Sequence, residues 1–495
     1  MKTTPLCNFR LRGQFAFALM LITFVAFAPR VRAFALLGPY ADWMVATNGY
    51  DHGYDIGGPM DINEEYRWDV PVVTYAFDQS FVDYFGSNGV AAVESAIQIL
   101  NDLPRSSDIV LSNFPPDTRG INFRSGGRYD LKSTALALLV EQMGLTQPVR
   151  NILDLRDWSP DVIQRNFDPE TLAASKVVNG ITYDGTLYTN GGLHDIVEFP
   201  LDPQASPNSA VADAFSYMYV GLPGGDFYSG LTSDDAGGFR YLLNATNVNW
   251  ESLPKDVLFT GKERNANKRL RGAWRPGVEK ITFVPQPVNK RGKFKTAILD
   301  FTAYYVTNGV TVPQPARRVV SRPDILFSAA ETFQSDSNSP MFLRTGTSKW
   351  VDNAKANGNT NGTGPGVIIP PIKITFDKGG LGIYTGDGYN YSAGRSWASF
   401  DASTNPPVLY PQNTGQVHML VRLHFYDTNT VPISEIKTTL FRAAVPFGKE
   451  ASFEISTNQT DWISLATAVN DGSILGWNYF GTRMPISFRV VPTGL

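Results

Sequence analysis

The sequence of 495 residues contains one cysteine, Cys7, and four histidines. Cys7 lies in an N-terminal segment that we expect to be removed on export, so the mature chain would have no thiol, disulfide or cysteine metal site. Its stability would therefore come from burial and from backbone hydrogen bonds. Histidine is just as scarce, and His194 is the only one between residues 70 and 250. That stretch therefore cannot supply a pair of histidine ligands to a metal.

Several motifs of common enzyme classes are also missing. The sequence has no nucleophile elbow, Walker loop, dinucleotide fingerprint or EF-hand loop. Adjacent acids occur at Glu64-Glu65 and Asp234-Asp235, but neighbouring carboxylates are typical of surfaces and helix starts. They do not place two acids across a cleft, as glycoside hydrolysis requires. The 43 basic and 46 acidic side chains give a formal charge of -3, so we expect no nucleic-acid partner.

The N-terminus has the features of an export signal. Basic residues at positions 2, 10 and 12 precede an apolar run of 14 residues, Phe15 to Ala28, which is shorter than the roughly 20 needed to span a bilayer. Val31-Arg32-Ala33 offers a small residue to signal peptidase. We expect residues 1–33 to be a signal peptide that is cleaved near Ala33; an uncleaved N-terminal anchor is the alternative. Cleavage would leave no transmembrane span and a periplasmic, cell-surface or extracellular protein.

Removal of the signal leaves 462 residues with 38 basic and 46 acidic side chains, a formal charge of -8. This length is enough for two or three domains. The 44 glycines, 33 prolines and 12% aromatic residues favour turns and β structure. Residues 34–69, rich in Gly, Tyr and Asp, are expected to form a leader that wraps over the next domain. Within the leader, Asp51 to Asp55 (DHGYD) resembles a ligand cluster, but these residues are also typical of turns, and we expect no metal there.

Residues 70–250 are expected to begin a domain that combines helices and strands. Val70 to Phe77 has the β-branched and aromatic content of a strand. Gly89 to Leu103 has apolar residues at helical spacing and ends at Pro104. Asp130 to Leu145 shows the same spacing and is predicted to be a second helix. A strand followed by amphipathic helices is typical of α/β or α+β domains.

The second of these helices contains TALALLVEQMGL, which resembles the zinc helix HExxHxxGxxH of matrixin-type metzincin metalloproteases. When Gly144 is placed on the motif glycine, Ala137 and Glu141 fall at the first two histidine positions. Leu138 then falls at the catalytic glutamate and Gln147 at the third ligand. The resemblance implies a metzincin-like domain at 70–250 whose zinc motif has degenerated.

The chemistry of these substitutions argues against protease activity. A catalytic zinc needs about three protein ligands, two of which this motif takes from one helix face. Ala137 cannot bind a metal, and Leu138 cannot act as the general base for a metal-bound water. Glu141 is the only ionisable residue left, and one carboxylate does not make a zinc site. We therefore expect no catalytic residue, no metal and no cofactor in this domain, which would be a pseudoprotease.

Two later segments extend the resemblance. Ser216 to Tyr219 resembles the Met-turn of the family, with Met218 as its methionine. Gly230 to Leu242 resembles the final matrixin helix, with Ser233 as the predicted N-cap. Between the zinc-like helix and Met218 lies a long insertion, residues 146–215. His194-Asp195 in this insertion is expected to belong to a loop or edge strand, with a transplanted ligand pair as the alternative.

The rest of the chain is predicted to be β-rich. Residues 251–345 contain three strand patterns and a basic stretch, residues 262–295, with eleven basic and two acidic side chains. This stretch is interpreted as a solvated edge; a patch for an acidic polysaccharide or a membrane surface is the alternative. Residues 346–370 form a linker or long exposed loop. Residues 371–495 are predicted to form a β-sandwich, with the clearest strand at 416–426.

The predicted architecture is an α+β metzincin-like domain followed by all-β domains, the last a β-sandwich. We expect an exported, non-catalytic protein that uses these domains for binding or for a structural role at the cell envelope or outside the cell. Its partner would be a protein or a polysaccharide, which the sequence does not identify. The alternative is a secreted hydrolase, such as a peptidase, with an unrecognised active site in the 146–215 insertion or between domains.

Overall fold

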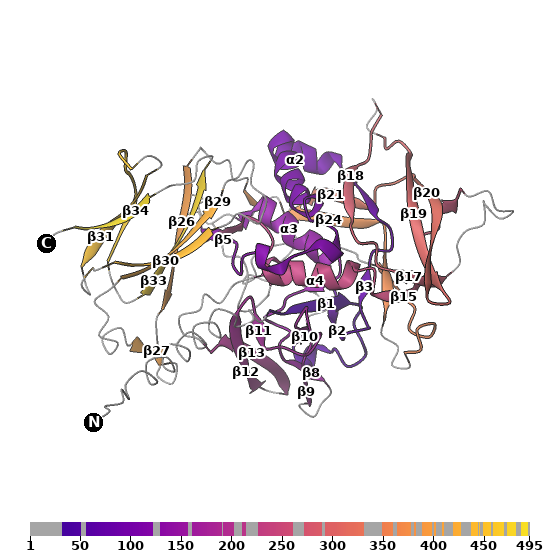
Figure 1. The fold of residues 1–495 in the computed structure, drawn as a ribbon, viewed down its shortest axis with the longest axis horizontal. Coiled ribbons are helices and arrows are strands. Elements are labelled where there is room, and N and C mark those ends of the chain that lie inside the picture. Colours follow the sequence, from indigo (N-terminus) through magenta and orange to yellow (C-terminus); the bar gives the residue numbers. More distant parts are fainter. Residues whose placement is uncertain are drawn as a thin grey trace, which may run out of the picture. The chain divides into compact units, whose positions relative to one another are not determined.

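The chain adopts a mixed α/β fold in which strands predominate and α-helices are few (Figure 1). No helix in the described part of the chain is long and apolar enough to cross a membrane. The computed structural model describes residues 32–495 except 51–55, 122–128, 157–160, 191, 202–209, 214–225, 261–271, 290–292, 331–348, 360–363, 378–380, 383–388, 398–399, 402–407, 410–418, 427–436, 444, 446–448, 457–458, 470–472, 482–486 and 494–495.

A parallel sheet of four strands contributes buried residues from every strand to the main apolar core. Its order is β18-β4-β21-β24. The strand expected near residues 70–77 is β4, but its neighbours come from much later in the chain. Strands on both sides of the expected boundaries near residues 250 and 371 therefore share one sheet. The four strands are β4 (Val72–Phe77), β18 (Thr282–Pro285), β21 (Ile325–Ala330) and β24 (Ile372–Asp377).

Helix α2 (Gln79–Asn101) packs on this sheet, as Figure 1 shows. The prediction of a helix here is confirmed, but the helix begins at Gln79 instead of Gly89. Gly86, with a φ of 63°, marks a kink that joins the two helical parts. The contact with the sheet is aromatic: the ring centroid of Phe81 lies 5.7 Å from that of Phe376 on β24.

A buried ion pair connects the sheet to the hairpin that precedes β21. The Arg318 guanidinium donates to both oxygens of Asp324, at 2.8 and 2.6 Å, and both side chains are 2% exposed. Asp324 also accepts the backbone N–H of Thr74 on β4 at 2.8 Å. Because every oxygen of this carboxylate is hydrogen-bonded, the buried charges are compensated.

A second sheet is built on the leader. All five residues of β1 are buried, so the leader supplies a core strand in addition to surface segments. The strand pairs with β2, β7 and β10, and helix α4 contacts it. The elements are β1 (Phe34–Gly38), β2 (Gly58–Met60), β7 (Leu145–Thr146), β10 (Asn166–Phe167), α3 (Leu131–Gln142) and α4 (Ser233–Leu243).

The described part of the 146–215 insertion is mainly strand. Its longest unit is the β12–β13 hairpin, in which Tyr183 pairs with Pro200 and Asn190 with Leu193. The described elements are β8 (Asp154–Arg156), β9 (Asp161–Ile163), β11 (Val177–Val178), β12 (Ile181–Asn190), β13 (Leu193–Pro200) and the 3-10 turn η4 (Val211–Asp213).

The loop expected within 346–370 connects two paired strands, β22 and β23. It is anchored, because the Asn357 side-chain oxygen accepts the N–H of Trp250 at 2.8 Å. The remaining elements before residue 371 are β3 (Tyr66–Arg67), β5 (Arg119–Ile121), β6 (Tyr129–Asp130), β14 (Asp226–Tyr228), β15 (Val248–Glu251), β16 (Val257–Phe259), β17 (Ala273–Pro276), β19 (Ala297–Thr307), β20 (Val310–Val320), β22 (Lys349–Asp352), β23 (Gly366–Ile369), η1 (Ala46–Asn48), η2 (Ser106–Asp108) and η3 (Leu111–Asn113).

The C-terminal segment forms further sheets. One has the order β26-β33-β29-β30 and another the order β32-β31-β34, while β27 pairs with β28 and β25 with β6. The strand predicted at 416–426 is β29. The bounds are β25 (Leu381–Gly382), β26 (Tyr389–Trp397), β27 (Phe400–Asp401), β28 (Val408–Leu409), β29 (Met419–Tyr426), β30 (Lys437–Ala443), β31 (Glu450–Ser456), β32 (Ile463–Val469), β33 (Ser473–Gly481) and β34 (Ser487–Thr493).

Candidate functional site

Helix α3 carries the degenerate zinc motif, and almost all of it is buried. Asp130 caps its start by accepting the Ser133 N–H at 2.8 Å. From residue 133 to 142 every side chain is buried, as expected for a helix that is apolar around its circumference. The helix ends at Gln142, and two residues later Gly144 has a φ of 101° in the left-handed region. The N–H of Gly144 donates to the Glu141 carbonyl at 2.9 Å.

The four motif positions separate into two pairs. Ala137 and Leu138 are 0% and 3% exposed and belong to the main apolar core. Glu141 and Gln147 are also buried, at 4% and 2% exposure, but both line one small cavity. The turn at Gly144 brings these two polar residues to the same space, although they are six residues apart in sequence.

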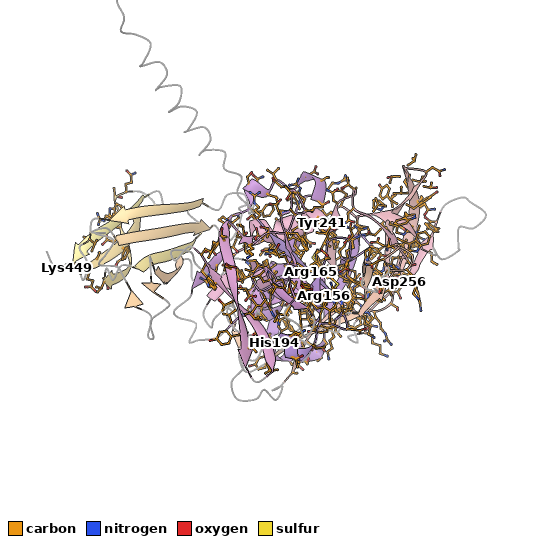
Figure 2. All side chains as sticks on the ribbon, turned by 90° about the horizontal axis from the view of Figure 1, so that it is seen from below. Arg156, Arg165, His194, Tyr241, Asp256 and Lys449 are labelled. Carbon is orange, nitrogen blue, oxygen red and sulfur yellow. The ribbon has the colours of Figure 1, made fainter. Side chains whose placement is uncertain are left out.

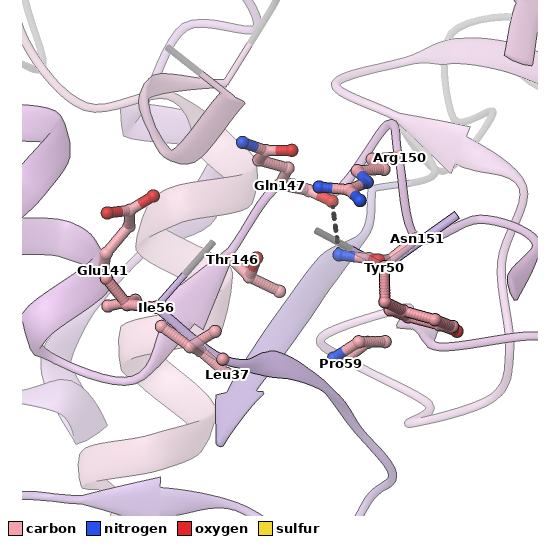
Figure 3. Close-up of a pocket in the computed structure, with 10 residues that line it drawn as sticks. Leu37, Tyr50, Ile56, Pro59, Glu141, Thr146, Gln147, Arg150 and Asn151 are labelled. Carbon is pink, nitrogen blue, oxygen red and sulfur yellow. Dashed lines mark hydrogen bonds between the residues drawn. The ribbon is translucent and has the colours of Figure 1, made fainter. Parts of the chain in front are cut away.

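The cavity is formed by the end of α3, the segment after β7 and the leader (Figure 3). Its volume of about 20 Å³ admits one or two water-sized groups. The side-chain oxygen of Gln147 is buried and accepts no hydrogen bond from the residues that the structure describes. The Gln147 backbone oxygen, by contrast, accepts the Asn151 side-chain N–H at 2.9 Å. The lining residues are Leu37, Tyr50, Ile56, Gly57, Pro59, Glu141, Thr146, Gln147, Arg150 and Asn151.

Tyr50 and Arg150 connect the cavity wall to the insertion. The Tyr50 hydroxyl donates to the Leu155 carbonyl at 3.1 Å and lies 3.4 Å from the Asp154 carboxylate. The Arg150 guanidinium donates to the Gly49 carbonyl at 2.8 Å. These contacts hold the leader against β8 and keep both polar side chains at the cavity.

Three carboxyl groups of the insertion lie around Arg150, and burial raises the pKa of each. Asp154 is 6% exposed, and burial raises its pKa to about 7. Burial, reinforced by the charge of Asp154, raises the pKa of Glu198 on β13 to about 9. The pKa of Asp195 is also raised by burial. Arg150 opposes all three shifts by favouring the ionised forms.

A second carboxylate pair, Asp234-Asp235, organises the start of α4. The N-cap is Thr232 and not Ser233 as predicted, and Thr232 and Asp235 form a reciprocal capping box. Asp235 also accepts the backbone N–H groups of Val211 and Ala212 at 3.0 and 3.1 Å. Asp235 therefore caps the helix and also holds η4 in place.

Asp234 connects α4 to the insertion and to residues 32–33, just before the leader. It is 1% exposed and accepts the Asn179 backbone N–H at 2.6 Å. Burial raises its pKa well above the ordinary value, against the effects of hydrogen bonds from Asn179 and Ala33 and of the positive charge of Arg32. The carboxyl of Asp234 therefore holds three segments of the chain together by hydrogen bonds.

Other residues singled out in the sequence are placed by the structure only in part. His194 lies on β13, as expected for a strand histidine, within 3.1 Å of the Thr189 hydroxyl (Figure 2). Met218 and residues 216–219 lie outside the described residues, as do Asp51 to Asp55. Across the described residues, no group of three His, Cys, Asp or Glu side chains is placed to hold a metal ion.

Comparisons with protein families, with curated proteins and with solved structures find no match to this chain. Any role for the cavity therefore has to be argued from its own chemistry.

Sequence reasoning missed four residues of the site: Tyr50, Arg150, Asp154 and Glu198. They come from the leader, the segment after β7, β8 and β13. Arg150 and Asp154 lie only three and seven residues after Gln147, but no short motif links them to Tyr50 in the leader or to Glu198 on β13.

Proposed function

We propose that this protein is exported and non-catalytic, with a metzincin-like domain whose zinc centre has been replaced by a small polar cavity. Its role is binding or structural, at the cell envelope or outside the cell. The C-terminal sheets, proposed to be a β-sandwich, and the other β regions would supply further binding surface.

One observation carries this proposal: the four motif positions have divided between core and cavity. Ala137 and Leu138 fill apolar space, where neither a metal ligand nor a general base is available. Glu141 and Gln147 keep polar atoms at the cavity, but one carboxylate and one amide offer too few donors for a catalytic zinc. The sequence and burial of α3 thus fit a protein that no longer hydrolyses peptides but retains a polar cavity.

The test is to purify residues 34–495, measure bound zinc and assay hydrolysis of unstructured peptides. The proposal expects no stoichiometric zinc and no hydrolysis. Zinc at one ion per chain, together with activity that a chelator abolishes, would overturn it.

The carboxyl cluster in the insertion favours a second candidate, a hydrolase that uses a site in residues 146–215. Two carboxyls whose pKa values lie near 7 and 9 can be protonated or ionised at neutral pH, as general acid–base catalysis requires. This candidate predicts hydrolysis that resists chelators and that both Asp154→Asn and Glu198→Gln abolish. Activity that survives both substitutions would rule out this cluster as its source.

A further inference from the structure

One edge of the β16-β20-β19 sheet has no strand beside it among the residues that the structure describes. That edge is β19, whose 11 residues all pair with β20 in a long antiparallel hairpin (Figure 1). Ile298 on β19 is 63% exposed, and the Asp300 side chain is 61% exposed. The outer face of this edge strand is therefore open to solvent.

The hydrogen-bond pattern shows which residues of β19 face the open edge. The Val319 N–H of β20 donates to the Asp256 carbonyl, just before β16, at 3.0 Å. The Pro315 carbonyl accepts the Thr260 N–H, just after β16, at 3.1 Å. Because successive residues of a strand bond to opposite sides, the residues of β20 between these two face β19. Every second residue of β19 from 297 to 307 therefore bonds to β20. The residues between them point their N–H and C=O groups away from β20: 298, 300, 302, 304 and 306.

Tyr304 agrees with this assignment and limits the length of the open segment. Its carbonyl oxygen accepts a hydrogen bond from the Arg275 guanidinium at 2.9 Å, as expected for a residue that faces away from β20. β17, which carries Arg275, also contacts β19. The open edge is therefore Ile298 to Thr302. Its outward-facing N–H and C=O groups, at residues 298, 300 and 302, have no partner outside the hairpin among the described residues.

The two outer strands of the hairpin region differ in how their edges are protected. On β20, Pro313 and Pro315 stand at positions that face away from β19, and proline offers no N–H to an incoming strand. β19 contains neither proline nor lysine. Its one charged residue, Asp300, pairs with Arg317 on β20 at 2.6 and 2.8 Å, so its charge is compensated within the hairpin. An edge without these protections is a place where another strand pairs.

The chemistry of the open edge selects its partner. Its N–H and C=O groups repeat about every 7 Å along β19, a pattern that the extended backbone of another polypeptide matches. The inner face beside the edge is apolar, since Leu299 and Phe301 are half-buried and Phe301 packs against the main core. An added strand would continue this face with apolar side chains at alternate positions.

We propose that the open edge of β19, Ile298 to Thr302, binds an extended segment of a partner protein. The segment adds an antiparallel strand to the sheet, in the same sense as the pairs that β20 makes with β16 and β19. Its apolar residues face Leu299 and Phe301, and the residues between them hydrogen-bond to β19. The inference rests on the proposed binding role and specifies the partner as a polypeptide.

The test is calorimetric titration of residues 34–495 with an acetylated and amidated peptide, Lys-Thr-Val-Thr-Val-Thr-Val-Lys. When its valines face the apolar side, its threonine N–H groups point toward β19 and its valine N–H groups point away. The peptide should bind with a dissociation constant on the order of 0.1 mM. N-methylation of the three threonines should weaken binding by about tenfold or more, because it removes the donors to β19. N-methylation of the three valines is the matched control and should leave binding unchanged.

Equal binding of the two methylated peptides would overturn the inference, as would the absence of binding by the unmethylated peptide at millimolar concentration. These peptides test the backbone pairing without any change in the protein.

A variant localises the binding to β19. Thr302→Pro removes an N–H that points away from β20, so the hairpin should keep its hydrogen bonds and the protein should fold. This variant should bind the peptide about tenfold more weakly or worse. Thr302→Val keeps the N–H and should bind like wild type. Wild-type affinity of Thr302→Pro would overturn the inference. A peptide-free dimer in sedimentation that Thr302→Pro dissociates would assign the edge to a second copy of this chain and overturn the partner protein.

These results separate the two proposals. Stoichiometric zinc with chelator-sensitive hydrolysis would remove the non-catalytic function itself. Failure of the peptide to bind a zinc-free, inactive protein would remove only the assignment of the partner.

Discussion

The buried carboxyl of Asp154 gives a stability dependence on pH that a single substitution should remove. Burial raises the pKa of this group from 3.8 to about 7 in the folded protein. The folded state therefore holds the proton more tightly than the unfolded state does. The resulting stability is fully present below the unfolded pKa and is lost as the pH rises to about 7.

The magnitude follows from the difference between the two pKa values. At 1.36 kcal/mol for each pH unit, the ionised carboxyl costs at most about 4 kcal/mol of folding free energy above pH 7. Asp154→Asn imitates the protonated acid and can keep an oxygen near the Tyr50 hydroxyl. We expect the variant to match wild type near pH 4 and to become progressively more stable than wild type up to about pH 7, after which the difference levels off.

The assay is urea unfolding followed by tryptophan fluorescence at several pH values between about 4.5 and 8, with the shift in midpoint converted to free energy. Asp161→Asn, which removes an exposed acid, is the control and should parallel wild type throughout. A variant whose difference from wild type stays constant with pH would refute the reasoning. So would one that is less stable than wild type at pH 8.

Three further substitutions test the packing that positions the site. Asp235→Ala should destabilise the protein by about 2 kcal/mol or more in urea unfolding, because it removes a helix cap and leaves buried N–H groups unpaired. A loss below about 0.5 kcal/mol would contradict this role of Asp235. Asp324→Leu should cost about 3 kcal/mol, since the buried Arg318 would lose both hydrogen bonds to Asp324 and keep only its ion pair with Asp256; a neutral effect would show that Asp256 alone compensates the charge. Gly144→Ala should lower the melting temperature, because φ is 101° and the new Cβ would overlap the Tyr66 carbonyl oxygen; an unchanged melting temperature would mean that the turn at the end of α3 can relax.

Helices and strands could be predicted from the sequence where their signals lie within a few neighbouring residues. α3 was predicted from its apolar spacing and from Gly144, and it ends where that glycine requires. The start of α2 was placed ten residues too late, because Gly86 and Gly89 look like loop residues. The structure accommodates them at a kink and against Phe85. Propensity alone could not foresee that tertiary packing would extend the helix.

The pairing of distant segments could not be predicted from local sequence patterns. Nothing near Val72–Phe77 indicates that β18, β21 and β24, more than 200 residues later, would pair in parallel with this strand or its neighbour. The convergence of Glu141 and Gln147 could be inferred only from the resemblance of the helix to a zinc motif. The Tyr50, Asp154 and Glu198 cluster required three separate segments to be placed together, and pairing of distant segments depends on the whole fold.

Zinc content measured together with peptide hydrolysis tests the central claim most directly. For residues 34–495 purified without chelator and then supplied with zinc, the account predicts less than stoichiometric metal after buffer exchange and no hydrolysis. It also predicts the same melting temperature with and without chelator, because no folding free energy comes from metal binding. One retained zinc per chain, with hydrolysis that a chelator abolishes, would contradict it.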